Sequence, residues 1–339
     1  MRLIKTEDAV GHVLCHDMTQ IIKDQYKDAR FRKGHVVTEE DIPVLLSMGK
    51  EHLYVWEMTP SMVHENDAAE RLLALCGQEN MIRSGVKEGK IELKAACDGV
   101  FLVDSARLVA VNSQDEVMIA TRKGGMAVRE GDKLAGMRVI PLIIEEEKLR
   151  KAEQAAGDKP LLSLKPYVRK TACIVATGGE VKKGLIKDTF TPVVIDKLKT
   201  YGIETLEVVY SGDGVENVRD AVLTMREKKP DMILCTGGMS VDPDDNTPGG
   251  IKAAGANIIA YGAPVLPGAM FLLGYFDDGM PVMGLPGCVM YAGATVFDLM
   301  LPKIAADVPV TRSDIAALGE GGLCLGCKPC HYPICPFGK

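Results

Sequence analysis

The feature that most constrains the fold is an alternation of apolar strand-like segments and amphipathic helical segments between residues 160 and 308. The strand-like segments read ACIVAT, IETLEVVY, DMILC and PVMGLPG, and patterns such as TPVVIDKLKTYG and GVENVRDAVLTMREKKP lie between them. Gly202 and Pro230 would end these two helices. The alternation is typical of a doubly wound, mostly parallel α/β sheet, in which ligands bind beyond the carboxyl ends of the strands.

The chain before this region has a different pattern. Residues 1–86 predict an α+β segment with short strands and with helices at about 41–48 and 63–76, each followed by a glycine. Residues 87–150 predict a small β-rich module, with strands in KIELKAACDG, LVAVNSQDEVMIAT and REGDKLAGMRVIPLII. Residues 145–160 are charged and end in a proline, so they predict a helical connector at the main domain boundary.

The charge of the chain limits the kind of partner. A net charge of -6 argues against a nucleic-acid backbone or an anionic membrane as the main partner, and favours a small or metal-bound ligand. The N-terminus lacks the apolar region of a secretory signal, so we expect a cytoplasmic protein with reduced thiols. The uncharged run 279–297 contains two prolines and four glycines, so we expect protein interior rather than a membrane span.

Three glycine-rich turns follow strands of the α/β region. They are ATGGEVKKGLIKD (176–188), CTGGMSVDPDDNTPGG (235–250) and GLPGCVMYAG (284–293), and we name them the first, second and third turns. Glycine lets a backbone approach a ligand closely, and the N–H groups at the start of a following helix can donate hydrogen bonds to an anion. One such turn alone is more often an ordinary connection in an α/β protein.

In combination the three turns resemble the molybdopterin-binding domain that molybdopterin adenylyltransferases and molybdenum insertases share. The resemblance covers about 171–304. It rests on Thr177, Gly178, Gly179, Glu180, Gly184, Ile186, Asp188, Thr236, Gly237, Gly238, Ser240, Asp245, Thr247, Pro248, Gly284, Leu285, Pro286 and Gly287. It implies that the residues of the three turns bind molybdopterin or the molybdenum cofactor, with Ser240 as a hydrogen-bond donor.

The resemblance implies a role in molybdenum cofactor biosynthesis. GMRVIPLII resembles the region that precedes this domain in insertases, which favours an enzyme that inserts molybdate into adenylylated molybdopterin and releases AMP. DNTP (245–248) is closer to the adenylyltransferase form, so adenylyl transfer is an alternative. Cys288 and Val289 stand where insertases usually have Asn-Pro, which favours a second alternative, a non-catalytic carrier or maturation factor for a molybdoenzyme. The family also implies a homo-oligomer.

The acids of the second turn need a cation if the ligand is an anion. A carboxylate beside a phosphate is unfavourable, whereas Mg²⁺ takes oxygens from both. The resemblance implies that Asp245 binds Mg²⁺ and acts in catalysis, with Asp188, Asp242 and Glu180 as weaker candidates. Asp188 has an alternative as a helix cap, and Asp242, like Asp244, has one as an ordinary turn residue.

The helix after the second turn has a clear start signal. Thr247 predicts its N-cap and Pro248 its first helical position.

The last segment, 319–339, is rich in cysteine. Cys324, Cys327, Cys330 and Cys335 form a C-x2-C-x2-C-x4-C pattern, and His331 is a further candidate ligand. Four reduced thiols at this spacing predict a Zn²⁺ or iron–sulfur site, with a redox or sulfur-handling group as the alternative. The glycine-rich lead-in ALGEGG would let this segment fold back towards the ligand site or act on a partner.

Overall fold

The computed structural model describes residues 2–22, 26–55, 61–240, 242 and 245–339. The chain divides into two compact units. The N-terminal unit comprises Met1–Lys94, Val103–Arg122 and Lys133–Ser163, and the C-terminal unit comprises Ala95–Leu102, Lys123–Asp132 and Leu164–Lys339. Within the described residues no helix has the length and apolar character needed to cross a membrane.

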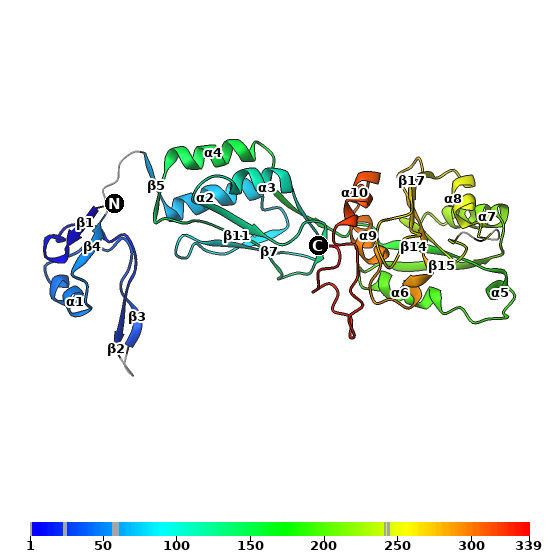
Figure 1. Ribbon diagram of the computed structural model, residues 1–339, viewed down its shortest axis with the longest axis horizontal. Helices are drawn as coiled ribbons and strands as arrows, with labels where there is room; N and C mark the ends of the chain where they lie inside the picture. Colours follow the sequence, from blue (N-terminus) through cyan, green and yellow to red (C-terminus); the bar gives the residue numbers. More distant parts are fainter. Residues whose placement is uncertain (1, 23–25, 56–60, 241, 243–244) are drawn as a thin grey trace. The chain divides into compact units, whose positions relative to one another are not determined.

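The start of the N-terminal unit is built from short antiparallel pairs around one helix (Figure 1). Strand β1 (Arg2–Lys5) pairs with β4 (His52–Val55), and β2 (Met18–Ile22) pairs with β3 (Tyr26–Phe31). Helix α1 (Asp41–Ser47) packs its buried Leu45 against Leu14 and Leu53 in a small apolar core. The predicted helix at 41–48 therefore exists.

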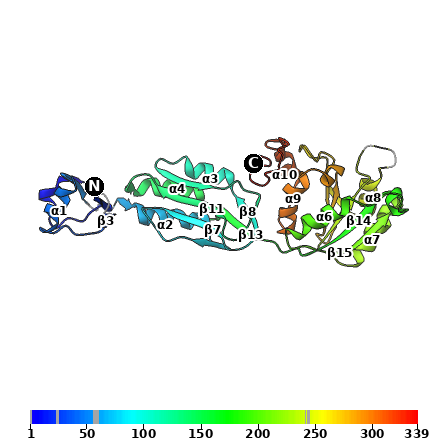
Figure 2. The same ribbon diagram turned by 90° about the horizontal axis from the view of Figure 1, so that it is seen from below.

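The rest of the N-terminal unit is a four-stranded antiparallel sheet with three helices (Figures 1 and 2). Its strand order is β6 (Met81–Arg83), β7 (Ile91–Ala95), β11 (Lys133–Val139) and β9 (Val117–Thr121). The helices are α2 (Glu65–Cys76), α3 (Ser105–Asn112) and α4 (Glu146–Ala156), and a short pair joins β5 (Met62–His64) to β12 (Ile143–Glu145).

Two predictions for this part are corrected by the structure. The segment LVAVNSQDEVMIAT was predicted as strand, but its first residues, LVAVN, belong to α3, whose start is capped by the Asp104 carboxylate through Arg107 N at 3.1 Å. The segment 145–160 is helical as predicted, but it is not a free connector. Helix α4 buries Leu149 and Ala152, and α2 holds it through ion pairs from Arg71.

The predicted β-rich module at 87–150 contributes to both units. Strands β8 (Gly99–Val103), β10 (Met126–Val128) and β13 (Leu162–Pro166) form a separate three-stranded sheet, most of which lies in the C-terminal unit. The Tyr167 hydroxyl donates to Gly99 O at 2.9 Å and helps to fasten this small sheet to the chain that enters the α/β region.

The C-terminal unit contains the predicted α/β sheet, which has six strands and is mostly parallel. The strand order is β15 (Glu204–Ser211), β14 (Thr171–Thr177), β16 (Met232–Thr236), β19 (Pro281–Leu285), β18 (Leu272–Tyr275) and β17 (Asn257–Tyr261). The first four strands are parallel, whereas β18 and β17 pair antiparallel. The sequence analysis did not predict these last two strands.

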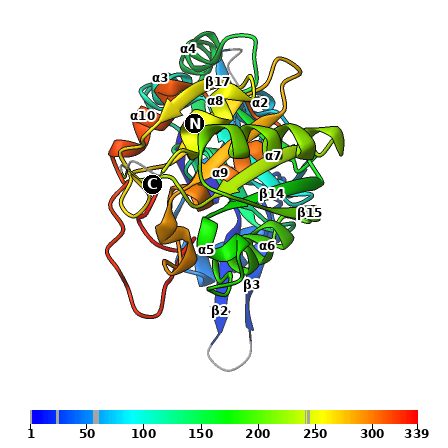
Figure 3. The same ribbon diagram turned by 90° about the vertical axis from the view of Figure 1, so that its right-hand side faces the viewer.

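Helices cover both faces of this sheet, as expected for a doubly wound fold. Successive side chains of a strand point to opposite faces, and β14 places Ile174 in one core and Val175 in the other. Helices α6 (Phe190–Lys199) and α9 (Val296–Ala305) pack on the first face. Helices α7 (Val215–Glu227) and α8 (Thr247–Ala253) pack on the second, and Figure 3 shows α7 and α6 on opposite sides of β14 and β15.

Candidate functional site

The three glycine-rich turns lie along one edge of the sheet. Strands β14, β16 and β19 are neighbours, and their parallel register pairs Ala176 with Thr236 and Thr236 with Leu285. The carboxyl ends of the three strands are therefore level, so the turns that leave them meet at the same place. This edge is where an open α/β sheet binds ligands.

A network of threonine hydroxyls joins the first turn to the second. Thr177 Oγ1 donates to Thr236 O at 2.9 Å and lies 3.1 Å from Thr247 Oγ1. Thr247 Oγ1 in turn donates to Gly237 O at 2.9 Å. All three threonines are buried, so these bonds form with little competition from water. The network fixes the first two turns to each other.

The glycines of the second turn are required by this close packing. Gly237 has a φ of +83°, and a Cβ atom there would lie 2.4 Å from Thr177 O. Gly238 has a φ of +56°, and a Cβ atom there would lie 2.6 Å from Thr247 Oγ1. The two residues thus serve the contact between turns, in addition to any approach of a ligand.

The first turn is closed by an acid that the sequence analysis missed. Gly178 N donates to Ser211 O at 3.2 Å, and Gly179 N donates to the Asp213 carboxylate at 3.0 Å. Asp213 lies in the loop after β15, which runs parallel to β14 and ends at the same edge. The sequence SGDG after an apolar strand is the signal that could have found it. Glu180 is exposed in the short helix α5 (Gly179–Lys182).

Asp245 closes the loop of the second turn. Its carboxylate accepts a hydrogen bond from Ser240 N at 3.0 Å, and its own N–H donates to Asp242 O at 2.9 Å. Burial and the negative charge of Asp245 raise the pKa of Tyr261, whose hydroxyl donates to Met239 O at 3.1 Å. The Tyr261 hydroxyl thus contacts the same turn that carries Asp245. Asp244 lies outside the described residues.

The start of α8 differs from the prediction by one residue. Its N-cap is Asn246, and Thr247 is the first helical residue with Pro248 second. Both polar groups of Thr247 bind the second turn: its N–H donates to Gly238 O at 3.1 Å and its hydroxyl donates to Gly237 O. Thr247 therefore binds the second turn and does not cap the helix.

Asp188 lies at the start of α6. Its carboxylate accepts hydrogen bonds from Phe190 N at 2.9 Å and Thr191 N at 3.0 Å, which are the contacts of the helix-cap alternative. Burial acts to raise the pKa of Asp188, but hydrogen bonds from Thr191, Phe190 and Tyr210 outweigh it and hold the pKa below its ordinary value. The carboxylate is therefore charged, and a catalytic role for it stays a prediction.

The third turn is partly interior and partly open. Leu285 and Pro286 are buried, and a Cβ atom at Gly284 would lie 2.5 Å from Met239 Sδ, so Gly284 serves packing against the second turn. Gly287 is exposed, and a Cβ atom there would have no other atom within 4 Å. Gly287 is thus the glycine of this turn that leaves room for a ligand.

Comparison with known families supports the resemblance in the turns. Residues 173–306 match a family model described as "Probable molybdopterin binding domain". The C-terminal unit therefore carries a domain of the molybdopterin-binding family. The match begins at β14 and ends just after α9, so this molybdopterin-binding domain includes all three turns. Residues 3–57 match a second model, described as "Domain of unknown function (DUF8806)".

Individual relatives of the molybdopterin-binding domain are distant. A CinA-like protein of Mycobacterium tuberculosis is 33% identical over 76 residues, which is 22% of this chain and 18% of that protein. The Mog protein of Mycobacterium ulcerans, described as a molybdopterin biosynthesis protein, is 19% identical with a TM-score of 0.34, covering 41% of this chain and 97% of that one. The molybdopterin biosynthesis enzyme MoaB of Thermus thermophilus is 15% identical with a TM-score of 0.36, and the match covers 42% of this chain and 98% of that one.

The four tail cysteines are not gathered into one ligand set. Cys327 and Cys330 are exposed, whereas Cys324 and Cys335 are partly buried against the core of the molybdopterin-binding domain. Over the part of the chain that the structure describes, no three His, Cys, Asp or Glu residues come together as a group that could hold a metal ion. In this arrangement the described thiols do not form a four-thiolate centre. The metal site in the tail rests on the cysteine spacing alone and stays a prediction.

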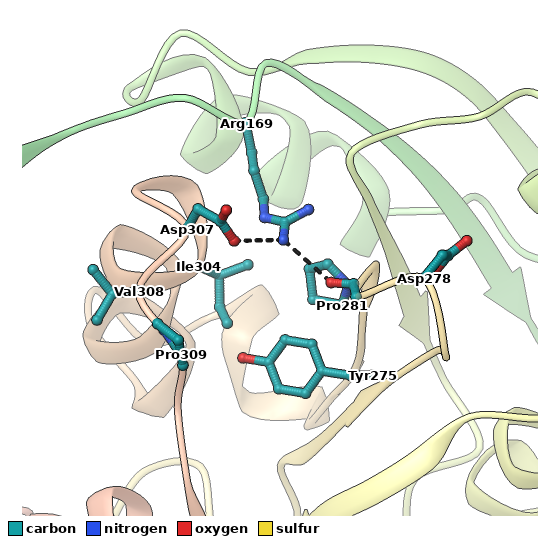
Figure 4. A pocket seen from close by; sticks show the side chains of 9 residues that line it. Arg169, Tyr275, Asp278, Pro281, Ile304, Asp307, Val308 and Pro309 are labelled. Carbon is teal, nitrogen blue, oxygen red and sulfur yellow. Dashed lines mark hydrogen bonds and ion pairs between the residues drawn. The ribbon is translucent and has the colours of Figure 1, made fainter.

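A cavity of about 350 Å³ lies at the opposite edge of the same sheet (Figure 4). It is lined by Arg169, by Tyr275, and by Pro281, the first residue of β19. Arg169 donates to Asp307 at 2.7 Å, to Asp231 O at 2.8 Å and to Gly279 O at 3.2 Å. Because three protein oxygens already hold this guanidinium, it is a structural brace and not part of the candidate ligand site.

Proposed function

We propose that the molybdopterin-binding domain takes molybdopterin, in its free or adenylylated form, at the three turns and acts in molybdenum cofactor biosynthesis. The observation that carries the proposal is that the three turns leave the sheet at the same edge, because the strands before them end at the same level. Contacts of Thr177 and Thr247 hold the first and second turns together. A rigid, glycine-lined edge can hold a phosphate and a planar ring in one orientation, which is what group transfer requires.

The acids at this edge support a cation together with the anionic ligand. Asp242 and Asp245 lie on one short loop, joined by the 2.9 Å hydrogen bond from Asp245 N to Asp242 O. Their carboxylates are hard oxygen donors, and Mg²⁺ commonly uses one or two carboxylates plus substrate phosphates. These two residues would hold Mg²⁺, and the ion would neutralise charge on the phosphate group that is displaced.

The chain's own residues would orient the ligand. The hydrogen bond from Ser240 N to the Asp245 carboxylate would hold Asp245 in place within the second turn. The Ser240 hydroxyl is exposed and is available as a hydrogen-bond donor to the ligand. Exposed Gly287 would leave the third turn open to the ligand. In our preferred form of the proposal the product is a molybdenum-loaded cofactor, with AMP released.

Two alternatives use the same edge. The DNTP sequence of the second turn favours an adenylyltransferase, which would consume ATP and free molybdopterin. Cys288, in place of the usual asparagine, favours a carrier that holds the cofactor for a molybdoenzyme and uses the tail thiols in docking or sulfur transfer. Metal analysis with a visible absorption spectrum would decide whether the tail holds Zn²⁺, an iron–sulfur cluster or neither. Size-exclusion chromatography with light scattering would test the homo-oligomer.

A turnover assay tests the proposal. Purified full-length protein is mixed with adenylylated molybdopterin, molybdate and Mg²⁺, and AMP release is followed. We expect release by the wild type and loss of at least about 100-fold in rate for Asp245→Ala, as when one key electrostatic group is removed from an active site. Asp277→Ala is the matched control, because Asp277 is an exposed acid beyond the end of β18, away from the turns.

The outcomes separate the candidates. Tight binding of adenylylated molybdopterin without AMP release would favour the carrier. Consumption of ATP with free molybdopterin would favour the adenylyltransferase. If neither form of molybdopterin binds at all, the proposed function is wrong.

A further inference from the structure

The C-terminal tail, defined as residues 321–339, is folded against the molybdopterin-binding domain (Figure 1). Its two ends meet, because Gly338 N donates to Gly321 O at 2.9 Å. Phe337 is 2% exposed and belongs to the main core, and Cys324 N donates to Leu266 O at 2.8 Å. The tail is thus a closed loop with an apolar anchor and not a loose extension.

A second anchor connects the tail to the start of α9. The Tyr332 hydroxyl donates to Asp298 O at 3.0 Å, and the Tyr332 ring packs edge-on against Phe337. The Asp298 carboxylate accepts from Thr295 N at 2.7 Å and caps α9, and it also pairs with Lys197.

Lys197 extends this network to the chain that leaves the third turn. Its ammonium group donates to Gly293 O at 3.3 Å. Tyr332, Asp298, Lys197 and Gly293 therefore form a continuous set of polar contacts between the tail and the end of the third turn.

A third contact is direct. A Cβ atom at Gly293 would lie 2.8 Å from Cys330 Cβ and 2.9 Å from Cys330 Sγ, so the tail packs on the bare backbone of Gly293. The φ angle of Gly293 does not lie in the left-handed region, so its backbone conformation does not require glycine. Glycine is required at this position because the tail leaves no room for a side chain. Cys330 is the tail residue that occupies the space.

The segment between Gly287 and Gly293 can carry this contact to the ligand edge. It is short and internally bonded, with Val289 N to Pro286 O at 3.1 Å and Ala292 N to Cys288 O at 2.9 Å. It is also tied to the start of α6, where the Thr189 hydroxyl donates to Met290 Sδ at 3.0 Å. A displacement at Gly293 would therefore move the third turn rather than be absorbed locally.

We infer that the tail is a positioning arm for the third turn: Cys330 and Tyr332 hold residues 287–293 in place, so that tail docking and ligand binding are coupled. This inference rests on the proposed function for the identity of the ligand. Coupling of this kind is reciprocal, so the ligand stabilises the docked tail by the same factor by which the docked tail favours the ligand. Cys330 and Tyr332 act through the turn and are positioning residues.

The test uses a clash and its relief. Gly293→Ala should push Cys330 away and weaken molybdopterin binding by about fivefold or more, the lower end of usual coupling factors. It should also speed amide hydrogen exchange in peptides that cover 287–293, in the absence of any ligand. Adding Cys330→Gly to the Gly293→Ala variant removes the atoms that clash. The alanine methyl group then takes the place of the Cys330 side chain in the contact between tail and turn, so both readouts should be restored. Leu325→Ala, at an exposed side chain of the same tail outside the cysteine pattern, is the matched control and should change neither.

A second variant and a second readout keep the inference testable if Gly293→Ala does not fold. Tyr332→Phe removes only the hydrogen bond to Asp298 O and should raise hydrogen exchange over 287–293 in the same direction. In the wild type, molybdopterin should slow the reaction of Cys330 with a maleimide more than that of Cys327, as reciprocity requires.

The failures are distinguishable. If the wild type does not bind molybdopterin, the proposed function fails, and the exchange experiment still tests the arm. If Gly293→Ala and Tyr332→Phe leave exchange over 287–293 unchanged, or if Cys330→Gly does not rescue Gly293→Ala, the positioning arm is overturned.

Discussion

Replacing Gly237 by alanine tests how closely the first and second turns are packed. Gly237 has a φ of +83°, and its missing side chain leaves room for Thr177. A Cβ atom would lie 2.4 Å from Thr177 O and 2.8 Å from Thr177 Oγ1, distances that real Cβ atoms do not show. The turn and the end of β14 must therefore separate, or the backbone of Gly237 must change.

The expected loss of stability follows from two contributions. An alanine held in the left-handed region costs roughly 1–2 kcal/mol relative to glycine. Displacing Thr177 also weakens its buried hydrogen bond to Thr236 O, and the loss of one such bond costs about 1 kcal/mol. We expect Gly237→Ala to destabilise the molybdopterin-binding domain by about 2–3 kcal/mol.

Gly287→Ala is the matched comparison for stability. A Cβ atom at Gly287 meets nothing within 4 Å and its φ is not in the left-handed region, so the change in unfolding free energy should stay within about 0.5 kcal/mol. The added methyl group occupies the open side of the third turn, so we expect Gly287→Ala to weaken molybdopterin binding without unfolding the domain. The two variants would then show that Gly237 serves packing between the turns, whereas Gly287 serves ligand binding.

The measurement is urea unfolding of the full chain by circular dichroism, combined with hydrogen exchange of peptides from β14 and β16. The exchange data assign the change to the correct unit, because a chain with two units need not unfold in one step. A Gly237→Ala protein whose stability lies within about 0.5 kcal/mol of the wild type would refute the reasoning from Thr177.

Two further predictions concern the acid at the start of α6 and the helix pair of the N-terminal unit. Asp188→Ala should cost about 1 kcal/mol at neutral pH, as loss of a helix cap does. Because the pKa of Asp188 is lowered in the folded state, its stabilisation is complete above the ordinary pKa of an aspartate and disappears as pH falls through the lowered value. The difference between wild type and Asp188→Ala should therefore shrink with acid in thermal unfolding from pH 7 to pH 3, and a constant difference would contradict this. Arg71→Ala should lose about 1 kcal/mol or less, because the two ion pairs to α4 are partly exposed, and the loss measured by urea unfolding should diminish in high salt.

Much of the architecture could be predicted because buried parallel strands leave a plain signal. Each of β14, β16 and β19 is an apolar run, and each ends in glycines where the chain turns towards a helix. Helices α1 and α2 are also close to their predicted bounds, since glycine follows each of them at or near its end.

The errors arose where local pattern and tertiary packing disagree. The residues LVAVN favour a strand by composition, but Asp104 caps a helix there and α3 packs against α4. The antiparallel strands β17 and β18 were missed because IIAY and LLGY are short apolar runs whose periodicity does not separate strand from buried helix.

The amino-acid sequence by itself determined the alternation of parallel strands and helices in the C-terminal unit, the α/β class and the three turns, because hydrophobic period and glycine placement are local properties of the chain. Only the tertiary structure decided which groups those turns contact. Asp213 reaches Gly179 across 34 residues, Thr247 reaches Thr177 across 70, and Cys330 lies on Gly293. Such contacts depend on strand register and on how far each loop extends, and no local periodicity encodes either of these.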